Sequence, residues 1–145
     1  MGVKIFTIGF TKTSAKGFFD RLKASGARRI VDVRLNNISQ LAGFAKRDDL
    51  AYFASEICGM DYSHLPALAP TQQILDEYKK SKGSWTNYER KFLQLMEDRK
   101  IEGLRPEQID GACLLCSEDK PHQCHRRLVA EYLKSKWGDV QIRHL

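Results

Sequence analysis

The chain has 145 residues, of which 42% are hydrophobic and 29% are charged. This length and composition are typical of a globular protein, and we expect residues 1–145 to form a single soluble domain. No apolar run approaches the ~20 residues that a membrane helix needs, which excludes a membrane-spanning protein. The first residues, MGVKIFTIGF, are expected to form a strand rather than a signal peptide, which favours a cytoplasmic location.

The net charge is +6, from 24 basic and 18 acidic residues. A basic protein suits an anionic partner, either a small phosphate-bearing ligand or a nucleic acid. The lysines are scattered along the chain, however, which also fits a solvated basic surface. There are four cysteines, and because nothing indicates secretion we expect reduced thiols rather than disulfides.

The first third of the chain has the pattern of a strand–helix–strand unit. A buried strand is expected over Lys4–Ile8, before Gly9, and a second over Arg29–Val33. Thr13 or Ser14 can cap the helix between them. The apolar stripe and the end of this helix are marked by Phe18, Phe19, Leu22 and Ser25-Gly26. Short connections of this kind predict parallel strands.

The middle of the chain predicts three helices and a short strand. In chain order these are a helix over Arg47–Ile57, a third strand over Asp61–Leu65, a helix over Gln72–Ser81 and a helix over Asn87–Arg99. Residues 102–111 are expected to form a loop because they contain two glycines and a proline.

The last third predicts a strand, a helix and a strand. The strand over Ala112–Cys116 is apolar, the helix runs from about Gln123 to Lys136, and the final strand is Val140–His144. The sequence therefore predicts an α/β fold: a single Rossmann-like domain with a mostly parallel sheet of about five strands and helices on both faces.

Polar and ionisable residues follow the ends of several expected strands. Because ligands bind beyond the carboxyl ends of the strands in open parallel sheets, we expect a site there. The residues delivered to this edge are Gly9 and Thr11, Asp32 and Arg34, His64, and Cys116, Ser117 and Glu118. Asp32 and Arg34 share one side of a strand, so they form either a local ion pair or an acid beside an anion-binding guanidinium.

The start of the last helix is expected to face the same edge. Cys124 and His125 precede the apolar face of this helix by three or four residues, which turns them toward the sheet and Cys116. The N–H groups of the helix N-terminus, together with Arg126, would form an anion site and favour a reactive thiol. We therefore expect Cys116 to be a nucleophile, with His125 as base and Glu118 as acid or orienting group. The structural alternatives are a core cysteine, a capping histidine and a solvated acid.

The cysteines are compatible with three other kinds of site. A zinc site of Cys113, Cys116, Cys124 and His125 has suitable ligand types. Strand alternation, however, puts Cys113 and Cys116 on opposite faces, so neither a metal nor another cofactor is expected. A redox pair of Cys116 and Cys124 requires the loop between them to fold back. A cysteine phosphatase loop would need an arginine where the chain has His122, so the sequence does not predict a phosphatase.

Several short motifs resemble the domain of unknown function 488 family. They are TIGFT at 7–11, DVR at 32–34, the WxxY of Trp85 and Tyr88, LLCSE at 114–118, CHR at 124–126 and the closing HL. The resemblance covers essentially the whole chain and implies an intracellular α/β protein, mostly found in prokaryotes, without a settled activity. The motif residues that it implies are Gly9, Asp32, Arg34, Tyr88, Cys116, Glu118, Cys124, His125 and Arg126. The family often has a proline and a basic residue soon after DVR, whereas Leu35-Asn36-Asn37 follows here.

The leading hypothesis is an enzyme that acts on an anionic ligand. The candidate catalytic residues are Cys116, Glu118, His125 and Asp32, and the candidate ligand-binding residues are Gly9, Thr11, Arg34, Ser117, Tyr88, Cys124 and Arg126. The helical spacing of Tyr88 with Phe92 also fits simple core packing. The alternatives are a non-catalytic nucleic-acid-binding module, whose affinity would fall steeply with salt, and a small Cys/His metal-binding protein.

Overall fold

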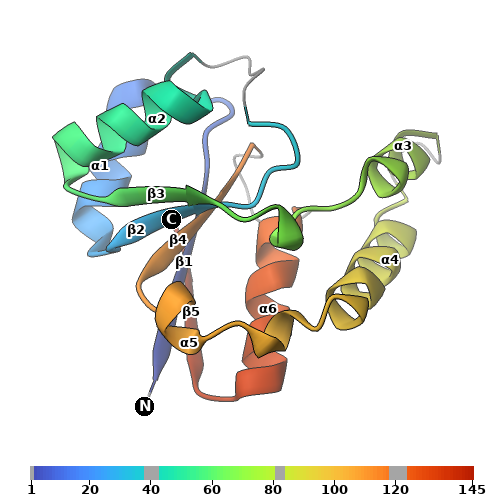
Figure 1. The fold of residues 1–145 in the computed structure, drawn as a ribbon. Helices are drawn as coiled ribbons and strands as arrows, with labels where there is room; N and C mark the ends of the chain where they lie inside the picture. Colours follow the sequence, from blue (N-terminus) through green and yellow to red (C-terminus); the bar gives the residue numbers. More distant parts are fainter. Residues whose placement is uncertain (1, 38–42, 81–83, 118–123) are drawn as a thin grey trace.

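Five parallel strands form the centre of the protein, and the chain ends beside the first of them (Figure 1). The computed structural model describes residues 2–37, 43–80, 84–117 and 124–145. The strands are β1 (Val3–Gly9), β2 (Arg29–Asp32), β3 (Asp61–His64), β4 (Ala112–Cys116) and β5 (Val140–His144), in the sheet order β3-β2-β4-β1-β5. All five expected strands are therefore present, and the α/β class is confirmed.

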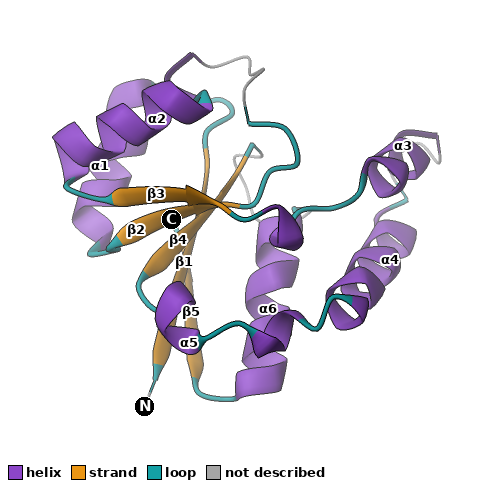
Figure 2. Ribbon diagram, in the orientation of Figure 1, coloured by secondary structure: helices purple, strands orange, loops and turns teal. Residues whose placement is uncertain are grey.

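Six α-helices connect or follow these strands within the described ranges (Figure 2). They are α1 (Ala15–Ser25), α2 (Arg47–Phe53), α3 (Gln72–Lys80), α4 (Trp85–Asp98), α5 (Pro106–Ile109) and α6 (His125–Trp137). Of the helices that the structure describes, none combines the length and apolar character needed to cross a membrane.

Two of the expected elements differ from the structure. The helix expected over Arg47–Ile57 changes after α2 into a π-helix over Ala54–Cys58, and Gly59 then ends it in a left-handed conformation. The segment 102–111 is not simply a loop, because it contains most of a 3₁₀ turn over Ile101–Gly103 and the short helix α5. Pro106 explains that helix, since the fixed φ of proline suits the first turn of a helix.

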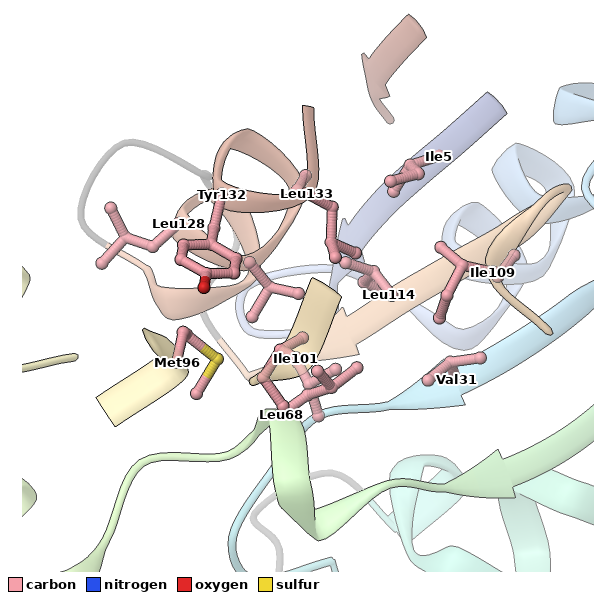
Figure 3. Close-up of a cluster of buried hydrophobic side chains, with 14 of the residues drawn as sticks. Ile5, Val31, Leu68, Met96, Ile101, Ile109, Leu114, Leu128, Tyr132 and Leu133 are labelled. Atoms are coloured by element: carbon pink, nitrogen blue, oxygen red, sulfur yellow. The ribbon is translucent and has the colours of Figure 1, made fainter. Parts of the chain in front are cut away.

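The sheet separates two hydrophobic clusters, because successive side chains of a strand point to opposite faces. On one face, Ile5, Val31 and Leu114 pack with residues of α4 and α6, such as Met96 and Leu133 (Figure 3). The other face packs against α1 and α2, with a cluster that includes Ile8, Phe18, Leu22, Ile30, Leu50, Cys113 and Leu115. Cys113 and Cys116 belong to different clusters, so the expectation from strand alternation is correct.

The order of the strands creates an opening at their carboxyl ends. The connections through α1 and α2 run along one face toward β3, whereas α6 lies on the other face and leads from β4 to β5. The chain therefore leaves β1 and β4, which are neighbours, toward opposite faces. Connections that diverge in this way leave a crevice at the carboxyl edge of a parallel sheet. The candidate site lies at this edge.

Candidate functional site

Arg34 is a buried guanidinium held by a buried carboxylate. Its Nε and Nη2 atoms donate hydrogen bonds of 2.8 and 2.7 Å to the two oxygens of Asp32. The hydroxyl of Tyr62 also donates to Asp32, and Asn37 donates to that hydroxyl. The Arg34 side chain is only 4% exposed, yet Nη1 has no hydrogen-bond partner in the described part of the chain. The local ion pair expected from the sequence is therefore present. The third nitrogen of the guanidinium, Nη1, is not used by this pair.

Two histidines fix the backbone that carries Arg34. Nε2 of His125 lies 2.6 Å from the carbonyl oxygen of Val33, and Nε2 of His64 lies 2.6 Å from that of Arg34. A carbonyl can only accept, so both Nε2 atoms carry the proton and donate. His64 at the end of β3 is therefore hydrogen-bonded to the backbone of Arg34, the second residue after β2.

Two sulfur atoms meet beside this backbone. Cys116 ends β4, Cys124 precedes α6, and the structure joins them as a disulfide. This pairing differs from the expectation of reduced thiols, and it arises because the start of α6 returns to the end of β4. Cys58 and Cys113 remain thiols, and burial raises the pKa of both. The four-ligand zinc site weighed from the sequence is excluded, because Cys113 lies on the other face of the sheet, whereas the pairing of Cys116 with Cys124 is present.

Arg126 places a positive charge directly against both sulfur atoms. Its Nη1 lies 3.3 Å from Sγ of Cys116 and 3.6 Å from Sγ of Cys124, and its side chain is fully buried. A guanidinium at this distance favours the thiolate form of a reduced cysteine. The sequence placed Arg126 in the anion site, and the structure buries it behind the disulfide.

His125 is a neutral imidazole at neutral pH. Burial lowers its pKa to about 4, against a smaller opposing effect of the hydrogen bond to Val33. Its ring also packs on Phe92, with 5.6 Å between the ring centroids. A group with such a pKa is a weak base, so Arg126 is better placed than His125 to stabilise a Cys116 thiolate.

A cavity of about 260 Å³ opens in front of these residues. Its polar floor and its aromatic wall come from different elements. The lining is formed by Arg34, Leu35, Asn36, Pro70, Gln72, Leu75, Tyr78, Trp85, Tyr88, Cys116, Ser117, Cys124 and His125. In the wall, the rings of Trp85 and Tyr88 stack with centroids 4.9 Å apart, and Tyr78 lies 5.1 Å from Tyr88. The volume suits a small molecule rather than a folded partner.

The structure brings most of the predicted site residues together. Arg34, Tyr88, Cys116, Ser117, Cys124 and His125 share the cavity lining, with Asp32 and Arg126 directly behind it. Gly9 pairs with Cys116 in the sheet, and the backbone N–H of Thr11 donates to the carbonyl of Ser117, but neither Gly9 nor Thr11 is part of the described lining. Glu118 and His122 lie outside the described residues.

Some residues of the site were not expected from the sequence. Tyr62 holds Asp32, and Leu75 and Tyr78 bring α3 to the cavity wall. No local signal connects α3 with the strand ends, because its position depends on how it packs against α4. The sequence indicated Trp85 only through the WxxY motif. For Leu75 and Tyr78, the only indication was a spacing that places both on one side of a helix.

The fold and the site together define an α/β protein with a buried arginine and a cysteine pair at the carboxyl edge of a parallel sheet. The chain belongs to the family described as "Domain of unknown function DUF488", whose model matches residues 14–133. The family resemblance of the sequence motifs is thus confirmed. Comparisons with curated proteins and with solved structures find no match.

Proposed function

We propose that the protein is an enzyme that binds a small anionic ligand, such as a phosphate ester or nucleotide, in the cavity and acts on it with Cys116. The observation that carries this proposal is the Nη1 atom of Arg34, which is buried at the cavity without a partner among the described residues. An unsatisfied buried donor costs about 1–3 kcal/mol, and an anionic oxygen would remove that cost. A planar guanidinium is also well shaped for phosphate and carboxylate oxygens.

The arginine is prepared for this role by its neighbours. Asp32 occupies two of its nitrogens, and His64 and His125 fix the adjacent carbonyls. A guanidinium held in this way loses little side-chain freedom when it binds. Its charge is balanced by Asp32, so the excess positive charge near the cavity comes from Arg126 and from the N-terminus of α6.

The chemistry that we assign to Cys116 requires the reduced protein. Reduction of the disulfide takes up two electrons and two protons and produces two thiols. A cellular dithiol can supply these electrons and protons. The Cys116 thiolate, stabilised by Arg126, then attacks an electrophilic atom of the ligand. A bond to sulfur forms, and the leaving group departs with the electron pair of the broken bond. Proton transfer to the leaving group is assigned to Glu118, the acid expected from the sequence.

The test uses inorganic phosphate and the alkylating reagent iodoacetamide on the reduced protein in the presence of a metal chelator. We expect phosphate to slow alkylation of Cys116, measured by mass spectrometry, with a saturable dependence on its concentration. Arg34→Gln should remove this protection. Arg29→Gln is the matched control, since Arg29 lies at the other end of β2, where it donates to carbonyls of residues 107, 108 and 110. Absence of protection, or full protection in Arg34→Gln, would contradict the proposal.

A further inference from the structure

The cysteine pair has a third neighbour that can supply a metal-ligand atom. Sγ of Cys116, Sγ of Cys124 and a ring nitrogen of His125 all lie within 4.8 Å of one another. They come from the end of β4 and the start of α6, two elements that pack against each other. Thiolate and imidazole are the ligand types preferred by zinc and related transition metals.

The orientation of His125 suits metal binding. Its Nε2–H donates to the carbonyl of Val33, which leaves the lone pair of Nδ1 as the electron donor of the ring. Metal-binding histidines almost always donate their other N–H to a carbonyl, a carboxylate or water, because that bond fixes the tautomer and the ring orientation. The hydrogen bond to Val33 therefore leaves His125 in the tautomer and orientation that metal binding through Nδ1 requires.

The backbone spacing of the two cysteines also leaves room for an ion. Their Cα atoms are 7.7 Å apart, whereas disulfides usually span about 4.4–6.8 Å. Two thiolates that bind one zinc ion each lie about 2.3 Å from it, so their sulfur atoms are farther apart than in a disulfide. A Cα–Cα distance longer than that of most disulfides suits this arrangement. The ion requires the reduced pair, so the disulfide and the metal are alternative states of the same two cysteines.

We propose that in the reduced protein Cys116, Cys124 and His125 bind one zinc-class divalent metal ion, with the remaining coordination position open to the cavity. All three residues line that cavity, and three protein ligands with an open position are typical of catalytic rather than structural zinc. Cys113 cannot supply a fourth thiolate, because it belongs to the cluster on the other face of the sheet.

The surrounding charges agree with such an ion. Two thiolates and a neutral imidazole balance a divalent cation, and Arg126 donates to both sulfurs from behind. An anionic ligand or hydroxide at the open position would then face a net positive centre. The metal is compatible with the proposed function, since a metal-bound thiol is deprotonated and Cys116 remains a thiolate.

The experiment titrates the reduced, chelator-treated protein with Co²⁺ and then with Zn²⁺. We expect one Co²⁺ per chain, with a thiolate-to-cobalt charge-transfer absorption that disappears when Zn²⁺ replaces it, because soft thiolate ligands favour zinc. Loss of an outer hydrogen-bond partner typically costs 10–100-fold in affinity, so loss of a ligand in Cys124→Ser or His125→Gln should cost at least about 100-fold. Cys58→Ser is the matched control, because Cys58 lies in the other cluster.

Two outcomes would overturn the proposal. One is the absence of stoichiometric metal in the reduced wild-type protein, a result that does not depend on any variant folding. The other is an unchanged affinity in both Cys124→Ser and His125→Gln. The two proposals also fail separately: Arg34→Gln should lose phosphate protection and keep the metal, whereas Cys124→Ser should lose the metal and keep phosphate protection of Cys116 under chelator.

Discussion

At the scale of single residues, Asp32 is the centre of the site's hydrogen-bonding network. It accepts from Arg34 and from Tyr62 while fully buried, so each donor offsets part of the cost of burying a carboxylate. Burial, together with the hydrogen bond to Asp32, raises the pKa of Tyr62 to about 12. The neutral hydroxyl of Tyr62 is therefore part of the folded structure well above neutral pH.

Replacing Tyr62 with phenylalanine should destabilise the protein by about 1.5–3 kcal/mol at pH 7, the usual worth of a hydrogen bond to a charged group. The Tyr62 pKa is raised on folding, so its contribution is complete below pH 10, the unfolded value, and is lost as the pH rises toward 12. Urea unfolding at pH 7 and at pH 11 should show a smaller difference between wild type and variant at the higher pH. Tyr52→Phe, at an exposed position, should have no comparable effect.

The sequence predicted this residue-scale picture only in part. Asp32 and Arg34 were paired by strand alternation, because residues i and i+2 share one side of a strand. Tyr62 was not found, since it reaches Asp32 from β3, and the pairing of β3 with β2 is a long-range contact with no local signal. For the same reason, the sequence did not show that the histidines at 64 and 125 bind neighbouring carbonyls.

At the scale of elements, the start of α1 is determined locally. Ser14 is the N-cap, and its Oγ accepts a hydrogen bond of 3.0 Å from the N–H of Gly17. The sequence left Thr13 and Ser14 as alternatives, and the structure selects Ser14. Caps of this kind are predictable because they depend on residues within one turn.

Ser14→Ala should lower the free energy of unfolding by about 1 kcal/mol, the typical cost of removing an N-cap side chain. Chemical denaturation provides the measurement. Thr13→Ala is the matched control, because among the described residues the Thr13 hydroxyl has contacts of 3.4–3.5 Å, all outside the cap. An effect of Thr13→Ala as large as that of Ser14→Ala would show that the assigned cap is wrong.

Elements that depend on tertiary packing were harder to predict. The π-helix over Ala54–Cys58 continues an ordinary helical pattern, and its wider turn is not encoded by any single residue. Helix α5 was missed because two glycines and a proline around it indicate a loop, although proline also favours a first helical turn. The position of α3 at the cavity also depends on tertiary packing, since α3 packs on α4 rather than on the sheet.

At the scale of the whole molecule, the position of the site followed from one rule about parallel sheets. The sequence predicts Arg34, Cys116 and His125 at the carboxyl edge even though it does not reveal the strand order. The reason is that all parallel strands end at the same edge. What it could not predict is the size of the cavity, which depends on how α3 and α4 stand above that edge. Net charge is another property of the whole molecule. Its effect on binding at different salt concentrations distinguishes the proposed enzyme from a nucleic-acid-binding module.

A small-ligand enzyme and a nucleic-acid-binding module predict different dependences on salt. A site built around Arg34 contacts one phosphate group, so affinity for a 5′-phosphorylated oligonucleotide should equal that for a mononucleotide and should have a slope in log salt near −1 or shallower. Arg34→Gln should weaken the binding of both ligands equally, as measured by fluorescence anisotropy across a series of salt concentrations.

A module that uses the +6 net charge would instead bind longer strands more tightly, with a slope that steepens by about 0.7 for each single-strand phosphate neutralised. Its affinity would also be indifferent to Arg34→Gln, because its cations would lie outside the cavity.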